Sequence, residues 1–135
     1  MISSSVTLSV LYVINKHVRV IEETSYDTEG SLAGCLRDEA TLQFIINEVN
    51  EMQDPFEKAA CFMYKTATRH PFVQGNKRIA FAIAHSLLMI AGWVVIVDGD
   101  TLYNFGLAVA RDEMTQGEIK AWFLNNVKKR EGYYH

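Results

Sequence analysis

The chain has 135 residues, of which 49% are hydrophobic and 21% charged, so it can bury a core and has an ordinary globular composition. We expect one domain over residues 1–135. The net charge of −3 argues against a general nucleic-acid-binding or anionic-membrane-binding surface. Cys35 and Cys61 lack C-x-x-C spacing and lie in apolar contexts, so we expect them to be reduced and buried, as in cytoplasmic proteins. No Lys or Arg precedes Lys16, unlike in a secretory signal.

The first third of the chain predicts two helices joined by a loop. Three serines, Ser3, Ser4 and Ser5, offer N-caps for the first helix. Its apolar stripe consists of Val10, Leu11, Ile14, Val18 and Ile21. Residues 22–34 lose periodicity and predict a surface loop of the kind that often carries function. The second helix is expected over roughly residues 35–52, with its inner face formed by Leu42, Ile45, Ile46 and Val49.

A third helix is predicted to begin at Pro55, with Asp54 as its N-cap, and to end near His70. Its inner face consists of Phe56, Ala59, Ala60, Met63, Tyr64 and Ala67. Because His70 precedes Pro71, helical geometry is disfavoured there, and the imidazole is expected to turn out of the helix.

The polar stretch from His70 to Arg78 then leads into an apolar run. A glycine-containing loop that opens a helix places unpaired backbone N–H groups at the positive end of the helix dipole, where anions bind. The positive charges of Lys77 and Arg78 would destabilise that end of the helix unless an anion were bound beside them. His70 is close enough in sequence to act as a general base beside the anion. These residues predict a phosphate cradle, with Phe72 as a buried loop anchor; the competing interpretation is a capped, solvated helix start.

The apolar run from Ile79 to Val97 has nineteen residues, about the length that spans a bilayer. We interpret it instead as a buried central helix over about residues 76–91. Gly92 suits the end of that helix, and residues 93–97 favour an extended path. No membrane association is therefore expected, and His85 is interpreted as a structural histidine.

Two more helices complete a predicted all-α bundle of about six helices around the buried central helix. Asp98 or Asp100 can cap the first, and Thr115 can cap the second in a capping box. Their apolar residues are Leu102, Phe105, Leu107, Val109 and Ala110 in the first, and Ile119, Trp122, Phe123 and Val127 in the second. Residues 128–130 are expected to form a solvated, cationic helix end.

The stretch His70–Arg78 resembles the signature loop of the Fic/Doc superfamily, His-Pro-Phe-x-(Asp/Glu)-Gly-Asn-Gly-Arg-x-x-Arg. The matching residues are His70, Pro71, Phe72, Gly75, Asn76 and Arg78. Lys77 and Phe81 replace the following Gly and the second Arg, as in the Doc (death-on-curing) branch. Gln74 replaces the acidic residue.

The resemblance implies a toxin of a toxin–antitoxin pair that transfers a phosphoryl group from ATP to a protein hydroxyl. Elongation factor Tu is the implied substrate, so translation is blocked, and an antitoxin whose tail folds into the cleft is the implied partner. The implied site consists of the base His70, the phosphate-binding Gly75, Asn76, Lys77 and Arg78, and the loop anchors Pro71 and Phe72. The acidic residue of the family holds the nucleotide's Mg²⁺, so Gln74 is expected to weaken that site.

Two alternatives stay open: a Fic-type enzyme that transfers AMP from ATP, and a degenerate non-catalytic module, suggested by Gln74. The segment Ser25–Gly30 also fits the pattern of Fic inhibitory helices. The inhibitory Glu of that pattern pairs with the second Arg of the signature, where this chain has Phe81. We therefore interpret the segment as an ordinary solvated loop.

Overall fold

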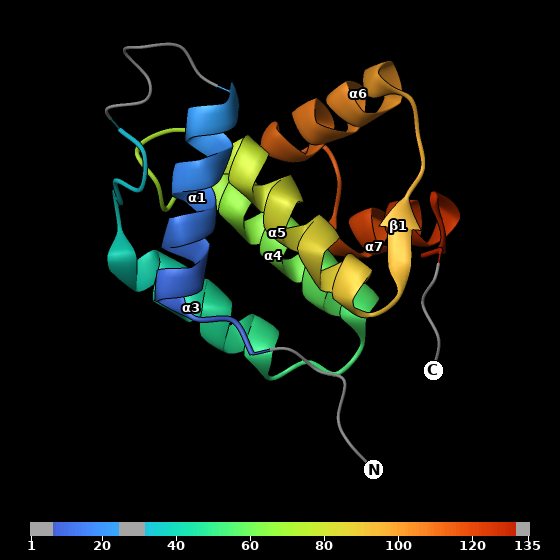
Figure 1. The fold of residues 1–135 in the computed structure, drawn as a ribbon, viewed down its shortest axis with the longest axis horizontal. Helices are drawn as coiled ribbons and strands as arrows, with labels where there is room; N and C mark the ends of the chain where they lie inside the picture. Colours follow the sequence, from blue (N-terminus) through green and yellow to red (C-terminus); the bar gives the residue numbers. More distant parts are fainter. Residues whose placement is uncertain (1–6, 25–31, 132–135) are drawn as a thin grey trace.

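The computed structural model describes residues 7–24 and 32–131, and Figure 1 shows how they are arranged. The helices in these residues are α1 (Val10–Thr24), α3 (Glu39–Asn50), α4 (Pro55–Arg69), α5 (Asn76–Ile90), α6 (Gly99–Ala110) and α7 (Gln116–Asn125). The strands are β1 (Trp93–Val95) and β2 (Val127–Lys129), which pair antiparallel with Val94 opposite Lys128. The predicted all-α bundle is confirmed, with one small sheet added.

Helices α4 and α5 form the centre of the bundle, with α1 and α3 on one side and α6 and α7 on the other (Figure 1). Alternate rows of α5 face these two sides. The row Ile79, Ile83 and Leu87 belongs to the core cluster shared with α1 and α3. The row Ala80, Ala84 and Leu88 belongs to the cluster shared with α6 and α7. Because α5 enters both clusters, the central helix is buried on two faces, as predicted.

The predicted stripe of α1 is confirmed in part: Ile21 is fully buried, and Val10, Ile14 and Val18 are half-buried. The helix begins at Val10, with the Ser9 hydroxyl accepting the backbone N–H of Tyr12 at 3.0 Å; the proposed caps at residues 3–5 lie outside the described residues. Leu11, placed in the apolar stripe, is 67% exposed. The fully buried residues of α1 are Val13, His17 and Ile21. The hydrophobic periodicity did not reveal this row, because His17 in its middle is a polar residue type.

Helix α3 starts at Glu39 and not near Cys35, because the preceding backbone pairs with the loop that follows α4. The N–H groups of Arg37 and Asp38 both donate to the Pro71 carbonyl, at 2.7 and 3.0 Å. The Asp38 carboxylate then caps the helix at the Thr41 N–H. The predicted inner face is confirmed, since Leu42, Ile45, Ile46 and Val49 are all buried.

The C-terminal cations do not end a helix as expected. Helix α7 stops at Asn125, and residues 127–129 form the strand opposite β1. Pairing with a strand distant in sequence therefore decides the structure of this segment, and the favourable interaction of cations with a helix end does not. The side chains of Lys128, Lys129 and Arg130 are nevertheless exposed.

The predicted helix starts are confirmed at Asp54, Asp98 and Thr115, each of which accepts a backbone N–H, and Thr115 shares a capping box with Glu118. In the described part of the chain, no helix has the length and apolar character needed to cross a membrane. Both cysteines are free. Burial raises the pKa of the Cys61 thiol to about 11, whereas Cys35 is only half-buried, which corrects its predicted burial.

The two-sided core of α5 predicts a sharp contrast between two identical substitutions. Leu88 is fully buried and Leu11 is mostly exposed. Leu88→Asp should lower the free energy of unfolding by more than about 3 kcal/mol, because a charge without a partner enters the core. Leu11→Asp should change it by less than about 0.5 kcal/mol. Urea unfolding of both variants measures this; equal destabilisation would contradict the assignment of the buried row of α1.

Candidate active site

His70 ends α4 in a left-handed conformation, with φ 54° and ψ 61°. Its backbone N–H still donates to the Thr66 carbonyl at 3.2 Å, and its side chain is exposed. The imidazole therefore leaves the helix as predicted, although through left-handed and not extended backbone. Such a conformation is rare for a residue with a side chain, so the surrounding contacts must hold it.

Arg37 supplies those contacts. Its Nε donates to the His70 carbonyl at 2.6 Å, and its Nη2 donates to the Arg69 carbonyl at 2.7 Å. These carbonyls lie at the negative end of the α4 dipole, where a cation is favourable. Sequence reasoning missed Arg37, because it lies 33 residues before His70 and in no motif.

The loop after His70 is anchored by Phe72 and Asn76. Phe72 is fully buried, and its ring stacks on the imidazole of His17 with a centroid separation of 3.9 Å. The side-chain oxygen of Asn76 accepts the Phe72 N–H at 2.9 Å, and its side-chain nitrogen donates to the Phe72 carbonyl at 3.0 Å. The side-chain amide of Asn76 thus closes the loop. The expected contact between Asn76 and a phosphate would then be made by its backbone N–H.

Gly75 forms the start of α5 with φ 72°. A Cβ at this position would lie 2.6 Å from Ile21 Cδ1 and 3.2 Å from His17 Nε2, so only glycine fits. The first backbone hydrogen bond of the helix runs from the Ile79 N–H to the Gly75 carbonyl. The N–H groups of residues 76–78 come before that bond, at the end of the helix that attracts anions.

A cleft of about 450 Å³ lies over this helix start. Its lining residues are Ala67, His70, Val73, Gln74, Gly75, Asn76, Lys77, Arg78 and Ala110. The predicted base and all predicted phosphate-binding residues therefore meet in one cleft, while Pro71 and Phe72 are buried. An imidazole, two cations and a helix N-terminus can together bind a phosphorylated ligand and accept a proton beside it.

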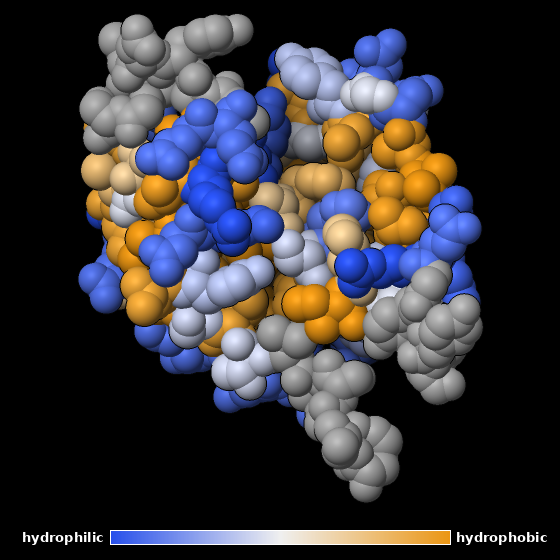
Figure 2. Space-filling view, viewed as in Figure 1, coloured by the Kyte–Doolittle hydropathy of each residue, from blue (hydrophilic) through white to orange (hydrophobic). Residues whose placement is uncertain are grey.

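A second, mostly apolar cleft of about 260 Å³ adjoins the first and shares Lys77 and Arg78 with it. Its other lining residues are Val20, Met63, Phe81, Leu102, Tyr103 and Gly106. Figure 2 shows the surface hollowed between α1 and α6, the two helices that provide part of this lining. The Lys77 ammonium lies 5.3 Å from the centre of the Tyr103 ring. Sequence reasoning missed the contribution of α6 to this cleft. The available signal was the pair Tyr103 and Gly106, which are three residues apart and therefore lie on one face of a helix.

The described residues of the cleft do not form a magnesium site. Among the described residues, no carboxylate lines the cleft, and no group of three or more His, Cys, Asp or Glu is placed to hold a metal ion. Asp98, a candidate substitute ligand, caps α6, and hydrogen bonds from Thr101 hold the pKa of its carboxyl below the usual value. Neither Asp98 nor Asp100 lines the cleft. Mg²⁺ prefers charged oxygen ligands, and here only the Gln74 side chain stands at the expected position.

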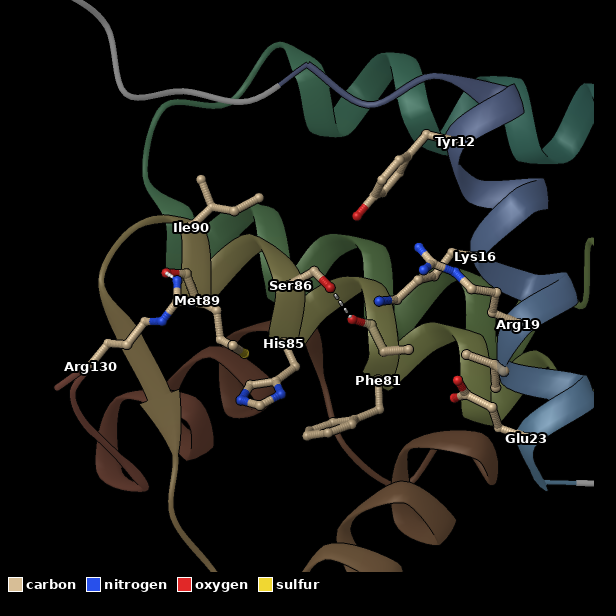
Figure 3. Close-up of a pocket in the computed structure, with 12 residues that line it drawn as sticks. Tyr12, Lys16, Arg19, Glu23, Phe81, His85, Ser86, Met89, Ile90 and Arg130 are labelled. Carbon is tan, nitrogen blue, oxygen red and sulfur yellow. Dashed lines mark hydrogen bonds between the residues drawn. The ribbon is translucent and has the colours of Figure 1, made fainter. Parts of the chain in front are cut away.

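A third cavity, of about 560 Å³, is a groove between α1 and α5 on the other side of Phe81. Figure 3 shows Tyr12, Lys16, Arg19 and Glu23 of α1 on one wall and Arg130 at the far end. Among the described residues, the charged groups that line this groove are three cations and one carboxylate.

His85 also lines this groove, outside the first two clefts. Its Nε2 accepts the Val95 N–H at 3.2 Å, and its ring packs on Phe81. Burial, aided by the charge of Lys16, lowers the pKa of His85, so it is neutral at pH 7. The predicted structural role of His85 agrees with these contacts.

A search of curated proteins finds no match to this chain. The model of the Fic/DOC family, however, matches residues 7–88. The match runs from just before α1 through the His70 loop to the last turn of α5. It therefore includes the central helix pair and the loop that connects the two helices. Because more than half of the sequence is matched, the chain belongs to the Fic/DOC family.

Proposed function

We propose that this chain is a Doc-like toxin that transfers the γ-phosphoryl group of ATP to a protein hydroxyl. The family implies a transferase that acts on proteins, and its members generally use ATP. The observation that carries the finer proposal is the position of Lys77. It lies in the first turn of α5, between Asn76 and Arg78, and shares one cleft with His70. By resemblance to Doc toxins, the acceptor is a threonine of elongation factor Tu.

The base, the two cations and the start of α5 each have a part in this transfer. The acceptor hydroxyl gives its proton to a ring nitrogen of His70 as its oxygen bonds to the γ-phosphorus. The bond from that phosphorus to the bridging oxygen breaks, and ADP leaves. Lys77, Arg78 and the backbone N–H groups at the start of α5 stabilise the charge on the phosphate oxygens. The apolar cleft beside Tyr103 has the shape and polarity to hold the base of the nucleotide.

The identity of the transferred group tests this proposal. Purified chain is incubated with elongation factor Tu and ATP labelled at either the α or the γ phosphate. We expect label from the γ position on the target protein, because Lys77 fills the space where AMP-transferring members have Gly. His70→Ala should abolish transfer while circular dichroism shows a folded protein, since His70 is exposed.

Label from the α position would replace this proposal with the AMP-transferring alternative. Expression of the wild-type chain alone should also arrest bacterial growth, and His70→Ala should relieve the arrest. A folded His70→Ala variant that still arrests growth would remove the base from the mechanism.

The degenerate-module alternative depends on Gln74. We propose that transfer is slowed but not abolished, because His70, Lys77 and Arg78 are all retained in the cleft. Gln74→Asp would add the missing carboxylate, so it should raise the transfer rate and lower the Mg²⁺ concentration needed for half-maximal activity. Gln74→Glu and Gln74→Ala serve as matched variants. Full wild-type activity at low Mg²⁺, with no effect of Gln74→Asp, would contradict this interpretation.

The antitoxin implied by the resemblance needs a docking surface, and we propose the groove between α1 and α5 (Figure 3). Its cations favour an acidic segment, and Phe81, Met89 and Ile90 offer apolar contacts. An acidic amphipathic peptide should therefore bind the chain more weakly after Lys16→Glu and Arg19→Glu, by about tenfold or more, and more weakly at high salt.

Fluorescence anisotropy of the labelled peptide measures this binding. Lys120→Glu is the matched control, because Lys120 pairs with Asp54 and Glu57 and does not line the groove. Equal losses in Lys16→Glu and Lys120→Glu would show that net charge and not the groove determines binding.

A further inference from the structure

We propose that His17 positions the phosphate-binding loop: its neutral imidazole joins α1, the segment at Gly34 and the carbonyl of Gln74, and thereby sets the geometry of the start of α5. The effect on catalysis rests on the transferase activity proposed above. Neither the sequence pattern nor the family motif includes His17.

The contacts of His17 join three segments that are far apart in sequence. Its Nδ1 accepts the backbone N–H of Gly34 at 2.9 Å. Its Nε2 lies 2.9 Å from the carbonyl oxygen of Gln74, 57 residues away. Its ring is fully buried and stacks on the Phe72 ring with an interplanar angle of 5°.

Only one protonation state and tautomer of the His17 ring can form both of these hydrogen bonds. A backbone N–H can only donate, so Nδ1 must carry a lone pair; a carbonyl can only accept, so Nε2 must carry the proton. An imidazolium would place two N–H groups against each other at Gly34. Burial lowers the pKa of His17, the hydrogen bond to the Gln74 carbonyl raises it, and the charge of Arg78 lowers it. The net effect is a lowered pKa, which agrees with a neutral ring.

The position of the Gln74 carbonyl matters because its peptide unit joins Gln74 to Gly75. The orientation of that unit is coupled to φ of Gly75, which is 72°, and the dihedral angles of Gly75 in turn orient the backbone that follows at the start of α5. His17 Nε2 also lies 3.2 Å from the place of a Cβ at Gly75. The imidazole therefore holds the loop both by a hydrogen bond and by close packing against the backbone.

A residue that only filled the core could be replaced by an apolar ring, whereas a positioning residue needs both hydrogen bonds. His17→Phe keeps a ring against Phe72 but leaves the Gly34 N–H and the Gln74 carbonyl without their partner. His17→Gln can restore both bonds, because the oxygen and nitrogen of an amide lie about as far apart as the two nitrogens of imidazole.

Steady-state kinetics with the full chain test the proposal. For His17→Phe we expect the KM for ATP to rise and kcat to fall, with kcat/KM for ATP lower by about 10- to 100-fold and the KM for the protein acceptor unchanged. His17→Gln should recover most of this loss. Val13→Ala, in the same buried row of α1, is the matched control: it should lower the melting temperature and leave the KM for ATP unchanged.

A folded His17→Phe variant with wild-type kcat and KM would overturn the proposal, as would a His17→Gln variant no better than His17→Phe. A readout without catalysis is the ¹⁵N spectrum of the wild-type imidazole. At pH 7 it should show the neutral Nε2–H form, and finding the proton on Nδ1, or on both nitrogens, would overturn the proposal even if no variant folds.

The same spectrum separates this proposal from the proposed function. A wild-type chain that transfers no phosphoryl group, but shows the Nε2–H form and a Gly75 amide signal that shifts in His17→Phe, would contradict the transferase and support the positioning role of His17.

Discussion

The left-handed glycine at the start of α5 is the constraint on which the site depends. Gly75 turns the chain into the first turn of α5, whose residues line the cleft, and a Cβ at this position would crowd Ile21 and His17. Everything around it holds this turn in place. Phe72 is buried beneath it, Asn76 closes the loop, and Pro71 accepts two N–H groups from the start of α3. Contacts within the chain thus hold the start of α5, and such pre-organisation reduces the entropy lost on binding an anion there, as proposed.

The central helix pair explains how so small a bundle can hold this loop. The loop is the connection between α4 and α5, and these two helices pack along each other through the middle of the molecule. The left-handed residue His70 is fixed at one end by Arg37, and Gly75 is fixed at the other by α1. Strain in the connection is therefore opposed by two cores at once, since α5 belongs to both.

Charge in the cleft is one-sided, and this defines its chemistry. Lys77 and Arg78 lie at a helix end that disfavours cations, and none of the described residues that line the cleft carries a carboxylate. In the proposed transfer, the phosphates of the nucleotide would supply the negative charge that this end of the helix favours. In the proposed function, the phosphates would therefore be recognised through cations and backbone dipoles, with little contribution from the described residues to the binding of a metal.

The local signals in the sequence determined much of this molecule. The sequence predicted the caps at Asp54, Asp98 and Thr115, the apolar row of α3, the burial of the central helix and the loop from His70 to Arg78, because each depends on neighbours a few residues away. Only the tertiary structure decided the rest. Arg37 and His17 act on a loop that lies 33 to 57 residues further along, and the pairing of β1 with β2 joins segments on either side of α6 and α7. Contacts of this kind depend on which faces of the packed helices meet, and the periodicity of one helix carries no record of its partner.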